Sequence, residues 1–144
     1  VDRQTEALLD LEPNPRATVV RADLEDGSPW PLNEKFAGVM VVNYLHRPLT
    51  ENLLESLEPG GLLIYETFAR GNENFSRPRN PDHLLKSGEL LQMVLGRLQV
   101  IAYEHGIREK CPLQGVIQRI CAVNNLDQSV REDREPQVLN LEPN

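Results

Sequence analysis

Residues 58–68 read EPGGLLIYETF, and this stretch decides the fold because a turn leads directly into an apolar run. Pro59 cannot continue a preceding helix, and the pair Gly60-Gly61 can adopt the positive φ angles that reverse the chain. The run 62–64 is apolar without interruption, which is typical of a strand covered on both faces. The stretch predicts a central strand with functional groups at its end, from Glu66 onward. The run 62–64 alone indicates only a buried strand, so the function has to come from its surroundings.

The composition favours one soluble globular domain of 144 residues, 40% of them hydrophobic. The net charge of −7 argues against nucleic-acid binding and makes an uncharged or cationic small molecule easier to accommodate. No apolar run reaches the roughly 18 residues that span a bilayer, and no signal-peptide pattern opens the chain. Cys111 and Cys121 lack the spacing of a metal site, so we expect plain thiols, no metal and a cytoplasmic protein.

Polar residues follow the predicted strands. The run 36–45 has the strongest strand signal, with polar Asn43 where its apolar part ends. A leucine stripe predicts an amphipathic helix between this run and residue 61: Leu49, Leu53, Leu54 and Leu57. This order predicts a right-handed βαβ unit, and a β-favouring run at 17–22 precedes it. Because ligands bind outside the carboxyl ends of such strands, Asp23, residues 43–46 and residues 66–68 should share one rim.

The remaining segments complete an α/β pattern. A helical pattern covers 5–11, and Asp2 before it stands where a strand would end, as if the chain began within an element. Asn80-Pro81 predicts a helix cap, and a main helix is expected over 88–95. Strands at 98–104 and 116–123, joined by a loop with Gly106 and Pro112, predict an antiparallel edge pair. The polar, acidic stretch from 125 predicts a disordered tail.

The connection 69–80 holds Arg70, Arg77 and Arg79 against a single acid, which is a local basic excess in an acidic chain. A loop of this kind is a candidate lid over a site. The alternative is a solvated loop whose arginines pair with nearby carboxylates. The composition leaves both interpretations open.

Familiar catalytic motifs are absent from the sequence. It contains no Ser-His-Asp, Cys-His or paired-carboxylate arrangement and no GxGxxG. His83 and His105 are expected at the surface. His46 directly follows a strand end, where a catalytic role and a capping or packing role are equally open.

The order of four segments resembles class I S-adenosylmethionine-dependent methyltransferases from their second strand onward: Val1-Asp2, Ala22-Asp23-Leu24, residues 36–45 and Leu57-Glu58-Pro59-Gly60-Gly61. Further motifs look like a bacterial branch of tellurite-resistance-type methyltransferases: Asn43-Tyr44-Leu45 with Arg47-Pro48, Glu66-Thr67-Phe68 and Gly71-Asn72-Glu73. The similarity covers roughly residues 1–123. It implies a Rossmann-like α/β domain over 1–124, mostly parallel with an antiparallel C-terminal edge pair, followed by the tail 125–144.

The resemblance also implies roles for individual residues. Asp2 matches the acid that binds the ribose hydroxyls of S-adenosyl-L-methionine (SAM), and Asp23, with Leu24 beside it, matches the acid that accepts from the adenine amino group. The motif Asn43-Tyr44-Leu45 matches the strand end that lines the methyl-transfer site. The acceptor would meet side chains beyond the strand ends: His46, Arg47, Glu66, Phe68, Arg70, Arg77 and Arg79. Asp23 could instead simply cap a turn.

Two departures from the family pattern matter. Ala37 stands where members usually have an acid. The glycine-rich loop that holds the methionine part of the cofactor is missing together with its strand and helix. That strand would lie beside 36–45, so we expect weak or absent SAM binding by this chain, and either self-association through the exposed edge or a rearranged sheet.

We therefore expect a methyltransferase that moves a methyl group from SAM to a small-molecule acceptor, with no nucleic-acid or membrane partner, although this chain could be an inactive fragment. Such chemistry needs mainly alignment and exclusion of water, so the lack of an obvious base is tolerable. The alternative is a non-catalytic methyltransferase-like binding or assembly module. A nicotinamide-dependent oxidoreductase ranks last because its fingerprint is absent.

Overall fold

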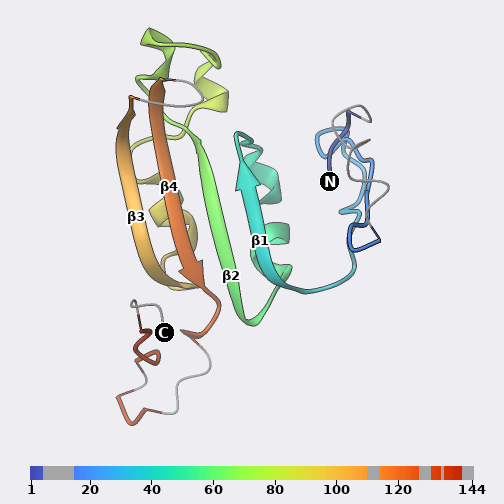
Figure 1. Ribbon diagram of the computed structural model, residues 1–144, viewed down its shortest axis with the longest axis vertical. Coiled ribbons are helices and arrows are strands. Elements are labelled where there is room, and N and C mark those ends of the chain that lie inside the picture. Colours follow the sequence, from blue (N-terminus) through green and yellow to red (C-terminus); the bar gives the residue numbers. More distant parts are fainter. Residues whose placement is uncertain (5–14, 110–113, 127–130, 134, 141–144) are drawn as a thin grey trace. The chain divides into compact units, whose positions relative to one another are not determined.

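The computed structural model describes residues 1–4, 15–109, 114–126, 131–133 and 135–140. The chain divides into two compact units, Val1–Glu34 and Lys35–Asn144. The larger unit contains a four-stranded sheet with two short α-helices (Figure 1). No helix in the described ranges has the length and apolarity needed to cross a membrane.

The sheet has the strand order β1-β2-β4-β3. Its members are β1 (Phe36–Val42), β2 (Leu57–Phe68), β3 (Gln99–Arg108) and β4 (Gly115–Val123). Strands β1 and β2 are parallel, whereas β4 runs antiparallel to both β2 and β3. The predicted parallel unit and antiparallel pair are confirmed, and β3 forms a sheet edge as expected. Strand β1 ends three residues earlier than predicted, and Gly106 lies within β3 and not in a loop.

The glycine pair that was predicted to precede the strand lies within β2, and its two glycines have different roles. Gly60 has a φ of 80°, as predicted, because only glycine adopts this angle without strain. Gly61 does not have a positive φ. A Cβ atom there would lie 2.9 Å from the carbonyl oxygens of Glu58 and Phe36. Gly61 is therefore needed because its backbone lies too close to the backbone of Glu58 and of Phe36 to leave room for a side chain. The positive φ that we predicted for both glycines occurs only at Gly60.

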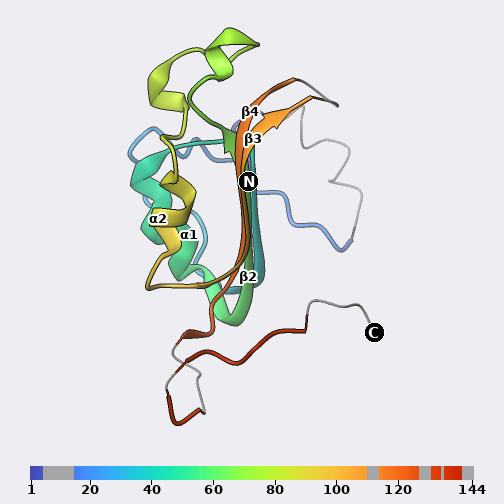
Figure 2. The ribbon, with the colours of Figure 1, turned by 90° about the vertical axis from the view of Figure 1, so that its left-hand side faces the viewer.

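Helices α1 (Thr50–Glu55) and α2 (Glu89–Val94) lie on the same side of the sheet (Figure 2). The 3-10 helix η2 (Arg47–Leu49) leads into α1, and η3 (Asn72–Asn74) and η4 (Pro81–His83) lie between β2 and α2. Asn80 caps η4 as predicted, because its Oδ1 accepts the Asp82 N–H at 3.0 Å. Leu57, assigned to the helical stripe from the sequence, begins β2 instead.

The core lies between the helices and one face of the sheet. It contains Val41, Leu54, Leu57, Leu63, Tyr65, Leu90, Val94, Leu98, Ile120 and Ala122. Complete burial of each large aliphatic side chain contributes about 1.5–3 kcal/mol. On the other face, Met40 is 69%, Val42 52% and Ile64 37% exposed. The expectation that both faces of β2 are covered is wrong within this unit, because α1 and α2 pack on the same side.

In the smaller unit, the predicted strand over 17–22 is reduced to one parallel bridge between Asp2 and Arg21. The Asp2 N–H donates to the Val20 carbonyl at 3.2 Å, and the Ala22 N–H donates to the Asp2 carbonyl at 3.1 Å. A β-favouring sequence forms a longer strand only where a neighbour continues the ladder. The predicted helix at 5–11 lies outside the described residues. In the tail, residues 131–133 and 135–140 lie outside any helix or strand, and disorder there stays a prediction.

Candidate functional site

The carboxyl ends of β1 and β2 meet, as the sequence predicted. Val42 lies level with Glu66 in the parallel register, and the Asn43 N–H donates to the Glu66 carbonyl at 2.9 Å. Asn43 has a φ of 54° and is the one non-glycine residue with a positive φ in the described part of the chain. Asparagine adopts this left-handed conformation at lower cost than most residues, and such outliers cluster at functional sites. The chain therefore turns sharply where it leaves β1.

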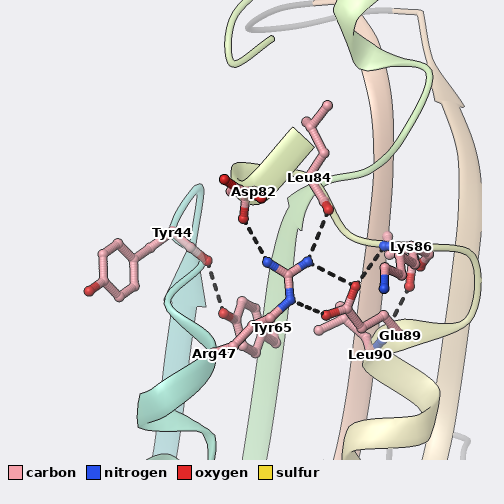
Figure 3. Close-up of polar contacts among 9 residues, drawn as sticks. Tyr44, Arg47, Tyr65, Asp82, Leu84, Lys86, Glu89 and Leu90 are labelled. Carbon is pink, nitrogen blue, oxygen red and sulfur yellow. Dashed lines mark hydrogen bonds and ion pairs between the residues drawn. The ribbon is translucent and has the colours of Figure 1, made fainter. Parts of the chain in front are cut away.

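Tyr65 holds the next residue of this rim from inside the core. Its hydroxyl group donates to the Tyr44 carbonyl at 2.9 Å (Figure 3). Tyr65 is only 2% exposed, and burial raises the pKa of its hydroxyl, reinforced by the neighbouring Tyr44. The hydroxyl therefore stays protonated at physiological pH and remains a donor. Leu45 and Tyr44 are half-buried and pack against the core, so the motif 43–45 is fixed at both ends.

Arg47 lies at the centre of a hydrogen-bonded clamp (Figure 3). Its Nε lies 2.5 Å from Glu89 Oε1, and one Nη lies 3.1 Å from Glu89 Oε2. The guanidinium also donates to the carbonyl oxygens of Asp82 at 2.6 Å and Leu84 at 3.1 Å. The hydrogen bond to Glu89 raises the pKa of Arg47 against its partial burial. Arg47, predicted at the acceptor site, thus ties η2 to η4 and α2, and its acceptor role stays a prediction.

Glu89 is a residue that sequence reasoning missed. Burial alone would raise the pKa of its carboxyl group, but the Arg47 hydrogen bond and the Lys86 N–H, which donates to Oε2 at 2.7 Å, outweigh it. The pKa therefore lies below its ordinary value. Glu89 is 42 residues from Arg47, and no local pattern connects the two. Its position in the first turn of α2 was the only available signal.

Gln118 was also missed, although it is completely buried. Its Oε1 accepts the Leu90 N–H at 3.2 Å and the Tyr103 hydroxyl at 3.1 Å. Its Nε2 donates to the Lys86 carbonyl at 2.6 Å. The N-cap of α2 is Gly88, which has no side chain to cap the helix, so a β4 residue satisfies a backbone donor of the first turn instead. Gln118 therefore connects β4 to the start of α2, the helix that also carries Glu89.

Glu66, predicted near the acceptor, lies in a charge ladder across three strands. Its Oε1 lies 2.6 Å from an Arg108 Nη, and its Oε2 lies 3.2 Å from Arg119 Nε. Arg119 also lies 3.1 Å from Glu104 Oε2. The register explains the ladder, since Arg119 is paired with both acids. Both carboxylate oxygens of Glu66 are therefore engaged by guanidinium groups, and the two arginines were not foreseen.

Phe68 is buried and forms a small cluster with Leu84 and Ile117. The Arg108 guanidinium carbon lies 6.0 Å from the centre of the Phe68 ring, at the limit of a cation–π contact. The aromatic ring thus packs beneath the charge ladder. A direct role of Phe68 toward an acceptor stays a prediction.

The three loop arginines, Arg70, Arg77 and Arg79, are exposed. Within the described ranges no carboxylate forms an ion pair with any of them, contrary to the expectation for a purely solvated loop with paired charges. The loop is anchored by Asn72, which is completely buried and whose Nδ2 donates to the Pro78 carbonyl at 3.1 Å. Phe75 is 39% exposed on the same loop. The loop is therefore anchored by a buried asparagine and carries three exposed arginines that have no ion-pair partner among the described residues.

The histidines and the cysteine show no catalytic pairing. His83 and His105 are exposed, as predicted. His46 is half-buried at the N-cap of η2, but its side chain makes no capping hydrogen bond, so the capping role is wrong, whereas the packing and catalytic roles stay predictions. Cys121 is a free thiol whose pKa is raised by burial, and Cys111 lies outside the described residues. No cluster of three or more metal-ligating side chains occurs in the portion of the chain that the structure describes.

In the smaller unit, the two predicted cofactor acids lie at the same end of the bridged segments. Asp2 Oδ1 accepts the Gln4 N–H at 2.8 Å, and Asp23 Oδ1 accepts the Glu25 N–H at 3.0 Å. Asp23 Oδ2 lies 3.8 Å from an Arg3 Nη in an exposed pair. Leu24 is half-buried. The turn-capping role of Asp23 is confirmed, and each carboxylate has a second oxygen outside its own turn.

A pocket of about 230 Å³ lies at the other end of the strands from Asn43 and Glu66. It is lined by Lys35, Leu54, Glu55, Leu57, Gly96, Arg97, Leu98, Asn124 and Leu126. Leu57 begins β2 and Asn124 follows β4, whereas Asn43 and Glu66 mark the carboxyl ends of β1 and β2. The pocket is therefore separate from the junction of Asn43 and Glu66.

Searches against family models and curated proteins give no match. Among solved structures, the chain is similar to a SAM-dependent methyltransferase from Methanosarcina mazei, with a TM-score of 0.55 and 14% identity, covering 85% of this chain and 79% of that one. It is also similar to TehB from Haemophilus influenzae, with a TM-score of 0.53 and 12% identity over 65% of this chain. The similarity spans only 37% of the TehB chain. At these identities the likeness shows the fold, which is a Rossmann-like α/β sheet of the methyltransferase type.

Proposed function

We propose that this chain has the function of a SAM-dependent methyltransferase acting on a small-molecule acceptor. The observation that carries the proposal is the junction of Asn43 and Glu66, with Asn43 in a left-handed conformation at the carboxyl ends of two parallel strands. In open α/β sheets, this edge is where ligands bind. The fold likeness to two methyltransferases supports the same assignment.

The residues present fit the adenosine part of SAM. The ribose hydroxyls and the adenine amino group are donors, and Asp2 and Asp23 each have a carboxylate oxygen that does not accept from its own turn. The ion pair between Arg3 and Asp23 is exposed, and such a pair stabilises the protein only slightly. A ligand that displaced Arg3 would therefore lose little binding free energy. Leu24 beside Asp23 offers an apolar contact, and the motif Asn43-Tyr44-Leu45 would face the reacting end.

SAM supplies a methyl group on a sulfonium, which is a good leaving group. The protein therefore has to align the acceptor and exclude water. Arg47 and Tyr65 are suited to positioning, since they fix the loops that follow β1 and β2. The wider acceptor set remains as proposed from the sequence: His46, Arg47, Glu66, Phe68, Arg70, Arg77 and Arg79.

The unpaired arginines favour an acceptor with an anionic group. Arg70, Arg77 and Arg79 are exposed on a loop with a buried anchor, and they stand against an overall charge of −7. Guanidinium groups bind oxyanions through paired N–H donors. An oxyanion acceptor would reverse the expectation of an uncharged or cationic molecule that came from the net charge of −7, and the sequence resemblance itself leaves the acceptor open.

The alternative function is a non-catalytic methyltransferase-like binding or assembly module. The open edge of β1 favours it, since the described residues offer β1 no second partner. Calorimetric titration of residues 1–144 with SAM, repeated with S-adenosylhomocysteine as a competitor, separates the two functions. Saturable heat that the competitor abolishes supports the methyltransferase, even at millimolar affinity. Absence of heat throughout the soluble range of SAM would favour the module.

A further inference from the structure

Strand β1 has one side of its backbone open. Among the described residues it pairs only with β2, and it lies at the sheet edge opposite β3 (Figure 1). The Asn43 N–H donates to Glu66 of β2, so the odd-numbered residues at this end of β1 direct their backbone groups toward β2. The backbone groups of successive residues in a strand point alternately to its two sides. The N–H and C=O groups of Gly38, Met40 and Val42 therefore point away from β2.

The open side of β1 has no charged residue or proline to protect it, and its register with β2 shifts only at its start, between Phe36 and Gly38. The sequence of β1 is FAGVMVV. Met40 is 69% and Val42 52% exposed, and Ile64 of the adjoining strand is 37% exposed on the same face. Exposed edges are usually blocked by Lys, Pro, bulges or inward charges, because open backbone groups recruit another strand.

The other edge of the sheet is protected. Strand β3 carries Glu104, His105 and Arg108, and its register shifts between Val100 and Ala102. A bulge and charged side chains both oppose the addition of a strand. Edge-to-edge pairing of β1 with β3 of another copy is therefore disfavoured. Pairing of β1 with β1 of another copy remains.

We propose that β1 pairs antiparallel with β1 of a second copy of this chain, about a two-fold axis at Met40. Gly38, Met40 and Val42 form a symmetric set around Met40, so the open groups of one copy match those of the other. In this register Met40 lies opposite its own counterpart, and Gly38 lies opposite Val42. No like charges face each other, despite a net charge of −7 on each copy. The result is a continuous eight-stranded sheet.

The register makes a geometric prediction. The two Met40 residues form a hydrogen-bonded antiparallel pair, for which the Cα atoms lie about 5.5 Å apart. The two Val42 residues are displaced by four positions along the strand, which separates their Cα atoms by roughly 14 Å. Both side chains point to the same, exposed face of the sheet, so reagent access is comparable. Val42 is therefore a matched control for Met40.

Cross-linking of the full chain tests the proposal. With Cys111 and Cys121 replaced by serine, Met40→Cys and Val42→Cys are treated with a bifunctional thiol reagent too short to join the Val42 pair. We expect at least about tenfold more cross-linked dimer from Met40→Cys, because only that pair lies within bridging distance. Equal yields, or no cross-linked dimer from Met40→Cys, would overturn the register.

Sedimentation equilibrium tests the association itself. The wild-type chain should show a reversible monomer–dimer equilibrium that tightens with added salt, since screening weakens repulsion between acidic copies. Met40→Lys places two ammonium groups opposite each other and should shift the equilibrium at least about tenfold toward monomer. Ile107→Lys, at a residue of β3 that is 58% exposed, should not. A wild-type chain that is monomeric at all concentrations, or equal behaviour of the two lysine variants, would contradict the proposal.

Discussion

The backbone N–H of Asn43 donates to the carbonyl oxygen of Glu66 at 2.9 Å, which joins the ends of the two parallel strands. Apart from this hydrogen bond, the two residues have different structural roles. Glu66 enters the ladder with Arg108 and Arg119, and Asn43 turns the chain through a left-handed conformation toward Tyr44. At this rim the end of β2 is held by ion pairs and the end of β1 is an exposed turn, and the proposed cofactor contacts of the larger unit, Asn43, Tyr44 and Leu45, lie on that turn.

Removal of the Asp23 carboxylate should weaken SAM binding. Asp23→Ala loses a charge-assisted acceptor for the adenine amino group, so the dissociation constant should rise roughly ten- to hundredfold, or about 1.5–3 kcal/mol. Calorimetry or a ligand-observed NMR titration measures this. Asp26→Ala is the matched control, because Asp26 Oδ1 accepts the Ser28 N–H at 2.8 Å just as Asp23 Oδ1 accepts the Glu25 N–H at 3.0 Å. Equal losses in both variants would reduce Asp23 to a turn cap.

The Arg47 clamp should stabilise the fold. Arg47→Ala removes four hydrogen bonds and should lower the free energy of unfolding by about 1–2 kcal/mol, less than for a buried pair because the side chain is 40% exposed. Arg47→Lys should recover only part of this, since an ammonium cannot reproduce the fork. Urea denaturation measures the change. Arg97→Ala breaks the more exposed pair with Glu51 and should cost less; the reverse order would contradict the clamp.

The same clamp should produce an acid-dependent loss of stability. The pKa of Glu89 is lowered in the folded protein, so ionised Glu89 stabilises the fold above its unfolded pKa. This contribution should disappear as the pH falls below the ordinary value of 4.5 and through the lowered folded pKa. The difference in unfolding free energy between wild type and Glu89→Gln should therefore shrink in acid. A difference that is constant from neutral pH down to pH of about 3 would show that the charge is irrelevant.

Gln118 should be a costly residue to replace. Gln118→Met keeps most of the buried volume but leaves the Leu90 N–H and the Lys86 carbonyl without their partner. Each unsatisfied buried group costs about 1–3 kcal/mol, so the loss of two partners should lower the free energy of unfolding by about 2–6 kcal/mol in thermal or chemical unfolding. Gln114→Met, at an exposed position just before β4, is the control and should be nearly neutral. Comparable stability of the two variants would contradict the role assigned to Gln118.

The loop arginines should bind oxyanions. Arg77→Gln with Arg79→Gln should weaken binding of inorganic tellurite or sulfate between about twofold and thirtyfold, as expected for two exposed ion pairs. Chemical shifts of the loop amides report the binding. Lys35→Gln with Arg97→Gln removes the same charge beside the pocket at the other end of the strands. If both double variants lose affinity equally, the effect is one of net charge and not of a site.

The sequence was sufficient for the strands that have strong local patterns. The runs at 36–45 and 62–64 and the leucine stripe between them predict a βαβ unit, and the structure confirms two parallel strands with a helix between them. The run 17–22 also contains β-favouring residues, yet it forms one bridge because the described residues offer it a single short neighbour, at Asp2. Strand propensity therefore predicts a strand only where pairing partners exist.

The polar contacts of the site could not be predicted in the same way. Arg47 and Glu66 were expected to face an acceptor, but their partners Glu89 and Arg108 each lie 42 residues further along the chain. Periodicity identifies which face of a strand a side chain occupies, but it does not identify the side chain opposite. Only the register of β2 with β4 places Arg119 beside Glu66.

The most direct test of the proposed function is an amide chemical-shift titration of the ¹⁵N-labelled 144-residue chain with SAM, because NMR detects binding even when it is weak. Shifts should concentrate at Asp23 and Leu24 and at Asn43, Tyr44 and Leu45, and S-adenosylhomocysteine should reproduce them. The absence of shifts at the highest soluble concentration, or shifts confined to the pocket around Lys35 and Arg97, would contradict SAM binding by these residues.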